Sequence, residues 1–194
     1  MPVYENERGT FLFNSKDLCM IGHIPDLLEA GIDSLKIEGR MKNALYVATV
    51  TRTYRKAIDD CLKDRKRYED QMDWYRKQIE SCTHREYCTG FYYGRPDENA
   101  QIYGSSTYCK DYVYLGIARE AGPEGYFSLE QKNKFSLGET VEIMKPDGRN
   151  IETKVLRIQD EEGNDMESAP HARQMLRVLL GEAPEQYDIL RRKG

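Results

Sequence analysis

Apolar residues in the first part of the chain recur every three or four positions, which is the spacing of helices that bury one face. This pattern predicts three helical segments: 14–30, 43–62 and 66–82. Asn14 or Ser15 can cap the first helix, and Gly31 ends it. Pro25 predicts a break or a new first turn inside this helix. The apolar faces of the two later helices are expected to be packing surfaces rather than ligand sites.

A short strand is predicted directly after the first helix, over residues 32–38. Leu35 and Ile37 point to one side of this strand, and its charged residues point to the other. A helix followed by such a strand is half of an α/β unit, whose backbone needs partners on both edges. Either the strand pairs with residues 11–13, or the chain is the tail of a longer α/β protein.

The pattern changes near residue 107. Short apolar runs separated by Gly, Pro and Asp are typical of strands and turns. Six strands are predicted: 112–119, 126–130, 140–144, 151–158, 175–180 and 187–190. Turn signals lie at residues 145–148 and 161–164. Six short strands in a row predict a small barrel that is closed or partly open.

These elements divide the chain into two folded parts and a linker. The α/β part with its two amphipathic helices covers residues 1–83, the linker covers 84–107, and the barrel covers 108–194. The predicted fold class is therefore an α/β remnant followed by a small all-β barrel domain.

Composition excludes several classes of protein. With 39% apolar residues and 14 Tyr, the chain is too hydrophobic to be disordered. It has no run of about 18 apolar residues, so a membrane span is excluded, and its first residues do not resemble a secretory signal. Five Cys without such a signal favour reduced thiols and a cytoplasmic location.

Charge is distributed unevenly although the net charge is only −4. Between Lys36 and Tyr68 there are ten basic and four acidic residues, a surplus of six positive charges. This stretch is the only plausible phosphate-facing surface. A solvated helix face is the alternative explanation, and it is favoured.

The sharpest local feature is the alternation of Lys36, Glu38 and Arg40 around Gly39 at the end of the predicted strand. Ligands of α/β proteins lie at the carboxyl ends of the strands, where Gly allows the backbone to turn. We therefore predict that Lys36, Glu38 and Arg40 are catalytic or substrate-binding, with Arg40 holding an acidic group by two parallel bonds. A structural ion-pair network is an equally good explanation.

Cysteine and histidine residues give two weaker candidates for a metal site or a reactive thiolate. Cys82, His84 and Cys88 lie within seven residues, but a tetrahedral site needs a fourth ligand. Cys19 lies near the start of the first predicted helix, where backbone amides favour a thiolate. No nucleophile elbow, HExxH motif or phosphate-binding Gly loop is present, so a hydrolase mechanism finds no support.

Two longer stretches resemble a known family. Residues 13–19 (FNSKDLC) and 24–42 (IPDLLEAGIDSLKIEGRMK) look like peptidase family U32, the collagenase-like family, and the resemblance continues through 84–85 (HR) and 89–92 (TGFY). It covers nearly the whole chain and corresponds to the later part of a family member.

The resemblance implies a fold and a cofactor. Members resemble a TIM-type barrel followed by a small β-barrel, so residues 1–83 would contain the last strand and helices of the larger barrel. Several members resemble oxygen-independent hydroxylation factors with a four-iron four-sulfur cluster on four cysteines. Cys19 matches the last of these and is the expected cofactor and metal ligand, and the other three would lie before Met1. We therefore expect that this chain alone binds no cluster and is inactive.

The resemblance also implies partners. The tRNA branch helps to hydroxylate a wobble uridine, with prephenate as the apparent oxygen source, so tRNA and a prephenate-like acidic small molecule are the expected ligands of the parent protein. An upstream barrel or a partner subunit would complete the fold. The alternatives are a collagenase-like peptidase and a stand-alone module whose β-barrel binds RNA or another partner.

Overall fold

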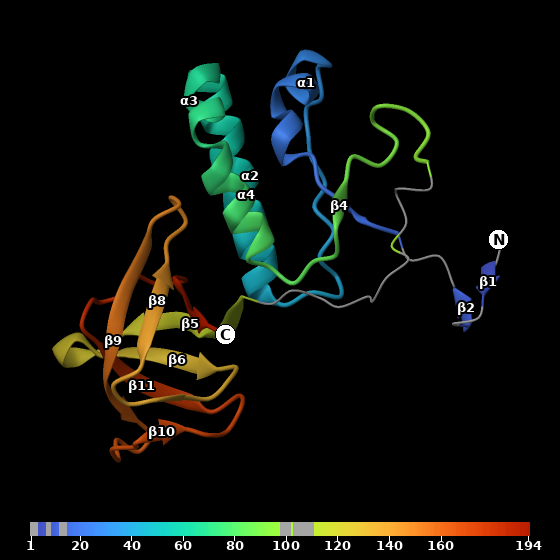
Figure 1. Cartoon of the computed structure of the whole chain (residues 1–194). Coiled ribbons are helices and arrows are strands. Elements are labelled where there is room, and N and C mark those ends of the chain that lie inside the picture. Colours follow the sequence, from blue (N-terminus) through green and yellow to red (C-terminus); the bar gives the residue numbers. More distant parts are fainter. Residues whose placement is uncertain (1–3, 7–8, 12–14, 98–101, 103–110) are drawn as a thin grey trace. The chain divides into compact units, whose positions relative to one another are not determined.

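The computed structural model describes the chain except for residues 1–3, 7–8, 12–14, 98–101 and 103–110 (Figure 1). The chain forms two compact units. Unit 1 consists of Met1–Glu38 and Ala57–Lys110, and unit 2 consists of Gly39–Lys56 and Asp111–Gly194. The structure thus groups residues 39–56 with the barrel. The boundaries after residues 83 and 107, which separate the α/β part, the linker and the barrel, remain a prediction.

Unit 1 contains short strands and helices, and one long helix, α2 (Ala44–Lys63), is divided between the units. Its elements are β1 (Tyr4–Asn6), β2 (Gly9–Phe11), β3 (Asp17–Leu18), η1 (Ile21–His23), α1 (Ile24–Glu29), α3 (Arg65–Asp70), α4 (Met72–Glu80) and β4 (Tyr87–Cys88). β1 pairs with β2 in antiparallel orientation, and β3 pairs with β4 in parallel orientation. Among the described residues, no helix is long and apolar enough to cross a membrane.

The helices agree with the sequence pattern except at the first segment. The segment predicted at 43–62 is α2, and the one at 66–82 is divided at Gln71 into α3 and α4. The helix predicted from 14 to 30 is wrong in its first half, because residues 17–18 form β3 and the α-helix begins only at Ile24. Pro25 lies in the first turn of α1, as predicted, since proline suits a position whose N–H needs no partner.

The predicted strand at residues 32–38 is not formed. These residues belong to no helix or strand, although Leu35 and Ile37 are half-buried and Lys36 and Glu38 are exposed, as a strand would place them. A strand needs a hydrogen-bonded neighbour, and none pairs with this segment within the described residues. Residues 11–13 were the predicted partner of this strand. Phe11 instead pairs with Tyr4, so the prediction is wrong for Phe11. Residues 12 and 13 lie outside the described residues.

Unit 2 is a closed six-stranded antiparallel barrel with strand order β11-β6-β5-β12-β8-β9 (Figure 1). Its strands are β5 (Tyr112–Ala121), β6 (Phe127–Gln131), β8 (Thr140–Met144), β9 (Asn150–Gln159), β11 (Met175–Leu180) and β12 (Ile189–Lys193). A short turn, η3 (Pro123–Gly125), precedes β6, and β7 (Phe135–Ser136) pairs with β10 (Ser168–Ala169). The six predicted strands and the predicted barrel are confirmed. Alternate residues of these strands fill the core, among them the fully buried Leu115, Leu129 and Ile143.

The first half of α2 packs on this barrel. Leu45 is buried against Tyr114, Met144 and Ile189. Arg52 is 7% exposed, and its guanidinium donates to the carbonyl of Lys145 (2.9 Å) and to Asn150 Oδ1 (2.8 Å) at the turn between β8 and β9. These contacts explain why residues 39–56 belong to the barrel unit.

Candidate functional site

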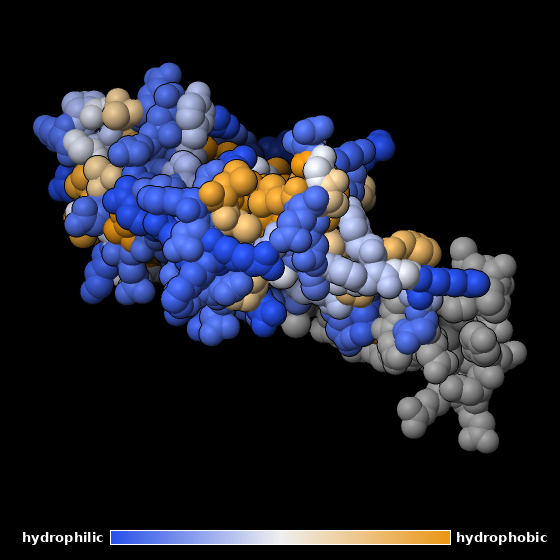
Figure 2. All heavy atoms as spheres, turned by 90° about the horizontal axis from the view of Figure 1, so that it is seen from above, coloured by the Kyte–Doolittle hydropathy of each residue, from blue (hydrophilic) through white to orange (hydrophobic). Residues whose placement is uncertain are grey.

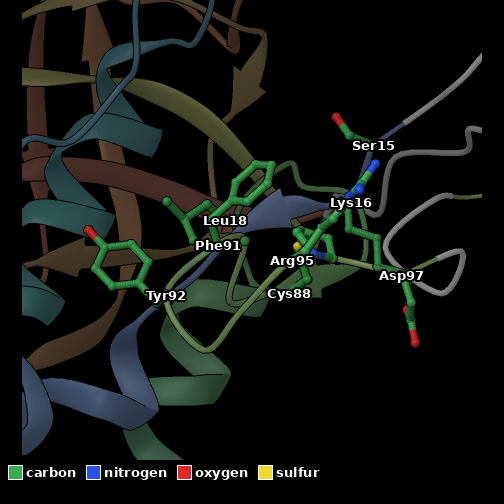
Figure 3. A pocket seen from close by; sticks show the side chains of 10 residues that line it. Ser15, Lys16, Leu18, Cys88, Phe91, Tyr92, Arg95 and Asp97 are labelled. Atoms are coloured by element: carbon green, nitrogen blue, oxygen red, sulfur yellow. The ribbon is translucent and has the colours of Figure 1, made fainter. Parts of the chain in front are cut away.

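The parallel pair of β3 and β4 forms the floor of an open, mostly apolar hollow in unit 1. Leu18 lies in register with Cys88, so that both side chains project from the same face of the pair. Figure 3 shows side chains from both strands and from the turn after β4 around a cavity of about 680 Å³. The lining residues are Ser15, Lys16, Leu18, Cys88, Gly90, Phe91, Tyr92, Arg95, Pro96 and Asp97.

The turn after β4 presents aromatic side chains to solvent. Phe91 is 79% exposed and Tyr92 is 52% exposed, whereas apolar side chains of this size are usually buried. Gly90 (φ 57°) and Gly94 (φ 126°) have backbone conformations that side chains other than Gly rarely adopt. Figure 2 shows that hydrophobic side chains lie exposed among a mainly hydrophilic surface.

Tyr93 attaches this turn to α1. Its hydroxyl lies 2.8 Å from Nδ1 of His23 and donates to the carboxylate of Asp26, and its ring packs on the His23 ring with centroids 4.9 Å apart. The hydrogen bond to Asp26 raises the pKa of Tyr93 to about 12. The same bond, together with His23, lowers the pKa of Asp26. The three side chains therefore form one hydrogen-bonded cluster between α1 and the turn.

Backbone and ionic contacts hold the two strands together at the other end of the hollow. Lys16 Nζ lies 2.9 Å from Glu86 Oε2. Asp17 Oδ2 accepts a hydrogen bond from the backbone N–H of Arg85 (3.1 Å). The position of Lys16 at the hollow is thus set by contacts on both strands.

Cys19 directly follows β3 and is not among the residues that line the hollow. Its backbone N–H donates to the carbonyl of Cys88 (2.9 Å), and the residue is half-buried and outside any disulfide. The predicted setting at a helix start is wrong, because Cys19 follows a strand and precedes η1.

One cysteine suits a four-iron four-sulfur cluster only as part of a larger set, because such a cluster needs several thiolates. Within the described residues, no group of three or more His, Cys, Asp and Glu could hold a metal. Cys82 is buried beside the carbonyl of Gln78, and His84 stacks on Tyr87 with centroids 4.5 Å apart. Within the described residues, the motif containing Cys82 and His84 therefore does not form a metal site by itself, and Cys19 as a cluster ligand remains a prediction.

Lys36, Glu38 and Arg40 are exposed side chains on the segment before α2. The boundary between the units falls after Glu38, so each of the three is described within its own unit, and their joint site remains a prediction. Gly39 is explained by close packing: a Cβ atom there would lie 2.9 Å from Cγ2 of Val47.

At least four of the ten basic residues in the stretch from Lys36 to Tyr68 make contacts within the chain. Arg65 pairs with Glu29 (2.8 Å), and Lys66 pairs with Asp70 (3.1 Å). Another surplus residue, Arg67, pairs with a buried carboxylate of α2 at 2.7 Å, and Arg52 is buried in the barrel unit. These pairs favour the structural explanation over a phosphate-facing surface.

From the sequence, residues 89–92 were noted only as part of the family resemblance, and not as an exposed aromatic turn. Three consecutive aromatic residues, Phe91 to Tyr93, between two glycines were the available signal, because such a run in a turn cannot be buried completely. The attachment of Tyr93 to His23 and Asp26 is a contact over about seventy positions in the chain, and no local pattern reveals it.

Comparison with known proteins gives consistent matches. Residues 3–102 match the model of peptidase family U32, and residues 110–191 match that of the peptidase family U32 C-terminal domain. The tRNA hydroxylation protein P1 of Bacillus subtilis is 34% identical over 193 residues, which are 99% of this chain and 46% of that protein. The tRNA hydroxylation protein P of Haemophilus influenzae is 34% identical over 171 residues, 87% of this chain and 36% of that protein.

A third relative is named as a protease rather than as a tRNA hydroxylation protein. The uncharacterized protease MJ0090 of Methanocaldococcus jannaschii is 46% identical over 91 residues, 47% of this chain and 22% of that protein. In all three comparisons the chain spans less than half the length of its relative.

Proposed function

The chain belongs to peptidase family U32, and from this premise we propose that it contributes to the hydroxylation of tRNA. The observation that carries the proposal is the similarity to tRNA hydroxylation protein P1, which extends over 99% of this chain. Because that match covers 46% of P1, the activity belongs to a larger assembly in which this chain is one part. Its place of action is the cytoplasm, where tRNA is modified.

Further protein completes the α/β part of the fold in this proposal. Parallel sheets are stable when both faces and both edges are covered, yet β3 and β4 form a pair with no third strand in the described residues. The segment 32–38 likewise has the alternating burial of a strand without a ladder. Additional strands of a TIM-type barrel, from the same protein or from a partner subunit, would supply the missing hydrogen bonds.

Cys19 would hold one iron of a four-iron four-sulfur cluster whose other ligands come from outside the described residues. When bound, such a cluster supplies electron transfer for oxygen-independent hydroxylation. The backbone bond to Cys88 fixes the position of Cys19 at the end of β3. Cys19 is half-buried, so it is not sealed in a core.

Lys36, Glu38 and Arg40 would bind the acidic small molecule that donates oxygen. The three are exposed and carry groups that recognise carboxylates or position a proton. The planar guanidinium of Arg40 suits two parallel bonds to a carboxylate.

A chimera tests this function. In B. subtilis P1, the stretch that matches this chain is replaced by residues 1–194, and tRNA nucleosides from a strain lacking P1 are analysed by mass spectrometry. We expect the hydroxylated uridine to return. Cys19→Ala in the chimera should lower its iron and sulfide content, and Cys82→Ala is the matched control. A folded chimera that carries iron but restores no hydroxylated nucleoside contradicts the proposal.

Peptide hydrolysis is the competing function, suggested by the family name and by the name of the M. jannaschii relative. Hydrolysis through a Ser, Thr or Cys nucleophile needs that side chain beside a base. Within the described residues, His23 contacts Asp26 and Tyr93, while His84 contacts a backbone carbonyl and the ring of Tyr87. Neither contacts a Ser, Thr or Cys side chain there. Gelatin cleavage by the chimera that persists after removal of iron would favour the peptidase.

A further inference from the structure

We propose that the turn after β4 is a stacking site for an unpaired base of the RNA, with Phe91 and Tyr92 as the stacking side chains and Arg95 as the phosphate ligand. This inference rests on the proposed function and assigns a surface of this chain to its substrate. It differs from the sequence-based expectation, which placed RNA on the basic helices.

Hydrogen bonds fix the conformation of the aromatic turn. Within it, the N–H of Tyr92 donates to the carbonyl of Thr89, and the N–H of Gly94 donates to that of Phe91, both at 3.3 Å. Tyr93 is bound to α1 through Asp26 and His23. Two rings are therefore displayed to solvent while the third is the anchor, so the stacking surface is ordered before a ligand binds.

The hollow beside the turn combines apolar walls with charged groups. Leu18 and Cys88 form its floor, Lys16, Arg95 and Asp97 line its border, and Lys16 pairs with Glu86 (2.9 Å). Arg95 is exposed and makes no ion pair with any residue that the structure describes, unlike Arg65 and the other cations of α3. An unpaired nucleotide has the matching chemistry, since its base stacks on aromatic rings and its phosphate is an anion.

A segment of protein is the other kind of occupant that fits an apolar hollow. The observations favour the nucleotide because two exposed planar rings lie next to Arg95, which makes no ion pair within the described residues. The cavity of about 680 Å³ also lies within the usual range for sites of small ligands.

Binding of RNA to the full 194-residue chain tests the inference. The probes are a synthetic tRNA anticodon stem-loop and a blunt RNA duplex of the same charge, measured by fluorescence anisotropy at several salt concentrations. We expect preference for the stem-loop, and about 5- to 150-fold weaker stem-loop binding for Phe91→Ala and Tyr92→Ala. Arg95→Gln should reduce the salt dependence by about one phosphate contact.

Tyr187→Ala is the matched control, because Tyr187 is 64% exposed and belongs to the barrel unit. It should bind the stem-loop as the unchanged chain does. Circular dichroism checks the fold of each variant, and the high exposure of Phe91 makes unfolding by its removal unexpected. No binding by the unchanged chain, equal affinity for stem-loop and duplex, or an equal loss for Tyr187→Ala would each overturn the inference.

The P1 chimera separates this inference from the function on which it rests. Stem-loop binding that depends on Phe91, in a chimera that hydroxylates nothing, leaves the stacking site standing and defeats the function. A chimera with Phe91→Ala that hydroxylates normally, together with unchanged stem-loop affinity, defeats the stacking site alone. If Phe91→Ala lowers the thermal stability of the chimera without changing RNA affinity, the hollow packs against protein and the inference is wrong.

Discussion

The barrel of unit 2 and the strand pair of unit 1 satisfy their backbones in opposite ways. Each of the six barrel strands has a hydrogen-bonded neighbour on both sides, so the sheet has no free edge. The pair β3–β4 has two residues per strand and, within the described residues, no further strand. The barrel strands thus satisfy one another's backbones, whereas within the described residues the outer edges of β3 and β4 have no neighbouring strand.

Buried and exposed polar groups occur in both units. In the barrel, Lys145 and Asp188 are 5% and 1% exposed and lie 2.6 Å apart. In unit 1, the carboxylate of Asp60 is buried, whereas the hydrogen-bonded cluster around Tyr93 is exposed. The cost of a substitution should therefore follow the burial of the group that it removes, and the following predictions run from the largest expected effect to the smallest.

Asp188→Asn should destabilise the barrel most, by about 3–5 kcal/mol, because it leaves the ammonium of Lys145 buried without its main counter-charge. Burial lowers the pKa of Lys145, but the bonds to Asp188 and Glu185 outweigh burial and raise it overall. Urea denaturation followed by far-ultraviolet circular dichroism measures the loss. Asp147→Asn is the control, since its pair with Arg149 is exposed and should be worth at most about 1 kcal/mol. Equal losses for the two variants would contradict the difference in burial.

Leu129→Ala should cost about 2–5 kcal/mol, because Leu129 is fully buried among the barrel side chains and its removal leaves a cavity. Leu18→Ala in unit 1 removes a side chain that is 58% exposed and should change the stability of the chain by less than about 0.5 kcal/mol. The same denaturation experiment compares them. In a larger assembly that covers the hollow with protein, Leu18→Ala would instead cost as much as a core substitution.

Tyr75→Phe should destabilise unit 1 by about 1.5–3 kcal/mol, the usual value for a hydrogen bond to a charged group. The Tyr75 hydroxyl donates to the buried carboxylate of Asp60 (2.6 Å), which also pairs with Arg67. Burial, followed by this bond, raises the pKa of Tyr75. Trp74 is the only tryptophan and lies in α4, so its fluorescence reports on unit 1 during denaturation. If Tyr75→Phe leaves the unfolding transition seen by Trp74 fluorescence unchanged and shifts only the unfolding of the barrel, the assignment of this contact to unit 1 is wrong.

The sequence predicted the barrel better than the α/β part, for a physical reason. In the barrel, each strand pairs with strands of the same chain, so alternation such as that of Phe127–Gln131 was enough to find it. The segment 32–38 has the same alternation, but no neighbour in the described residues turns it into a strand. Residues 17–18 were misassigned to a helix because two residues are too few to show a period.

The candidate site was predicted in part, and the limit is again the distance between contacting residues along the chain. Cys19 as a cluster ligand stays a prediction from the motif around it, and its position after β3 depends on a backbone hydrogen bond to Cys88, about seventy positions away. Arg52 was counted as a surface cation, but it is buried at the turn after Lys145, and charge counting does not detect burial. Residues 89–92 were noted only for the family resemblance, because the exposure of Phe91 is a property of the folded structure.

Tyr93→Phe should have the smallest effect on stability and should sharpen the comparison through its pH dependence. The folded pKa of Tyr93 is raised from 10.0 to about 12, so its contribution is complete below pH 10 and is lost as the pH rises toward 12. The pKa of Asp26 is lowered from 3.8, so its contribution is present above that value and is lost as the pH falls through the folded pKa. The difference between the unchanged chain and Tyr93→Phe should therefore be largest between about pH 4 and 10 and should shrink on both sides.

Nuclear magnetic resonance of the turn measures this difference, because amide exchange at Gly94 reports opening of the turn while the barrel amides serve as the internal reference. Faster exchange at Gly94 in Tyr93→Phe at neutral pH, with unchanged exchange in the barrel, is the expected result. Equal exchange at Gly94 in both proteins would mean that the glycines and backbone bonds alone hold the turn. Phe91 and Tyr92 would then be displayed without the anchor, and the role of Tyr93 as a positioning residue would be wrong.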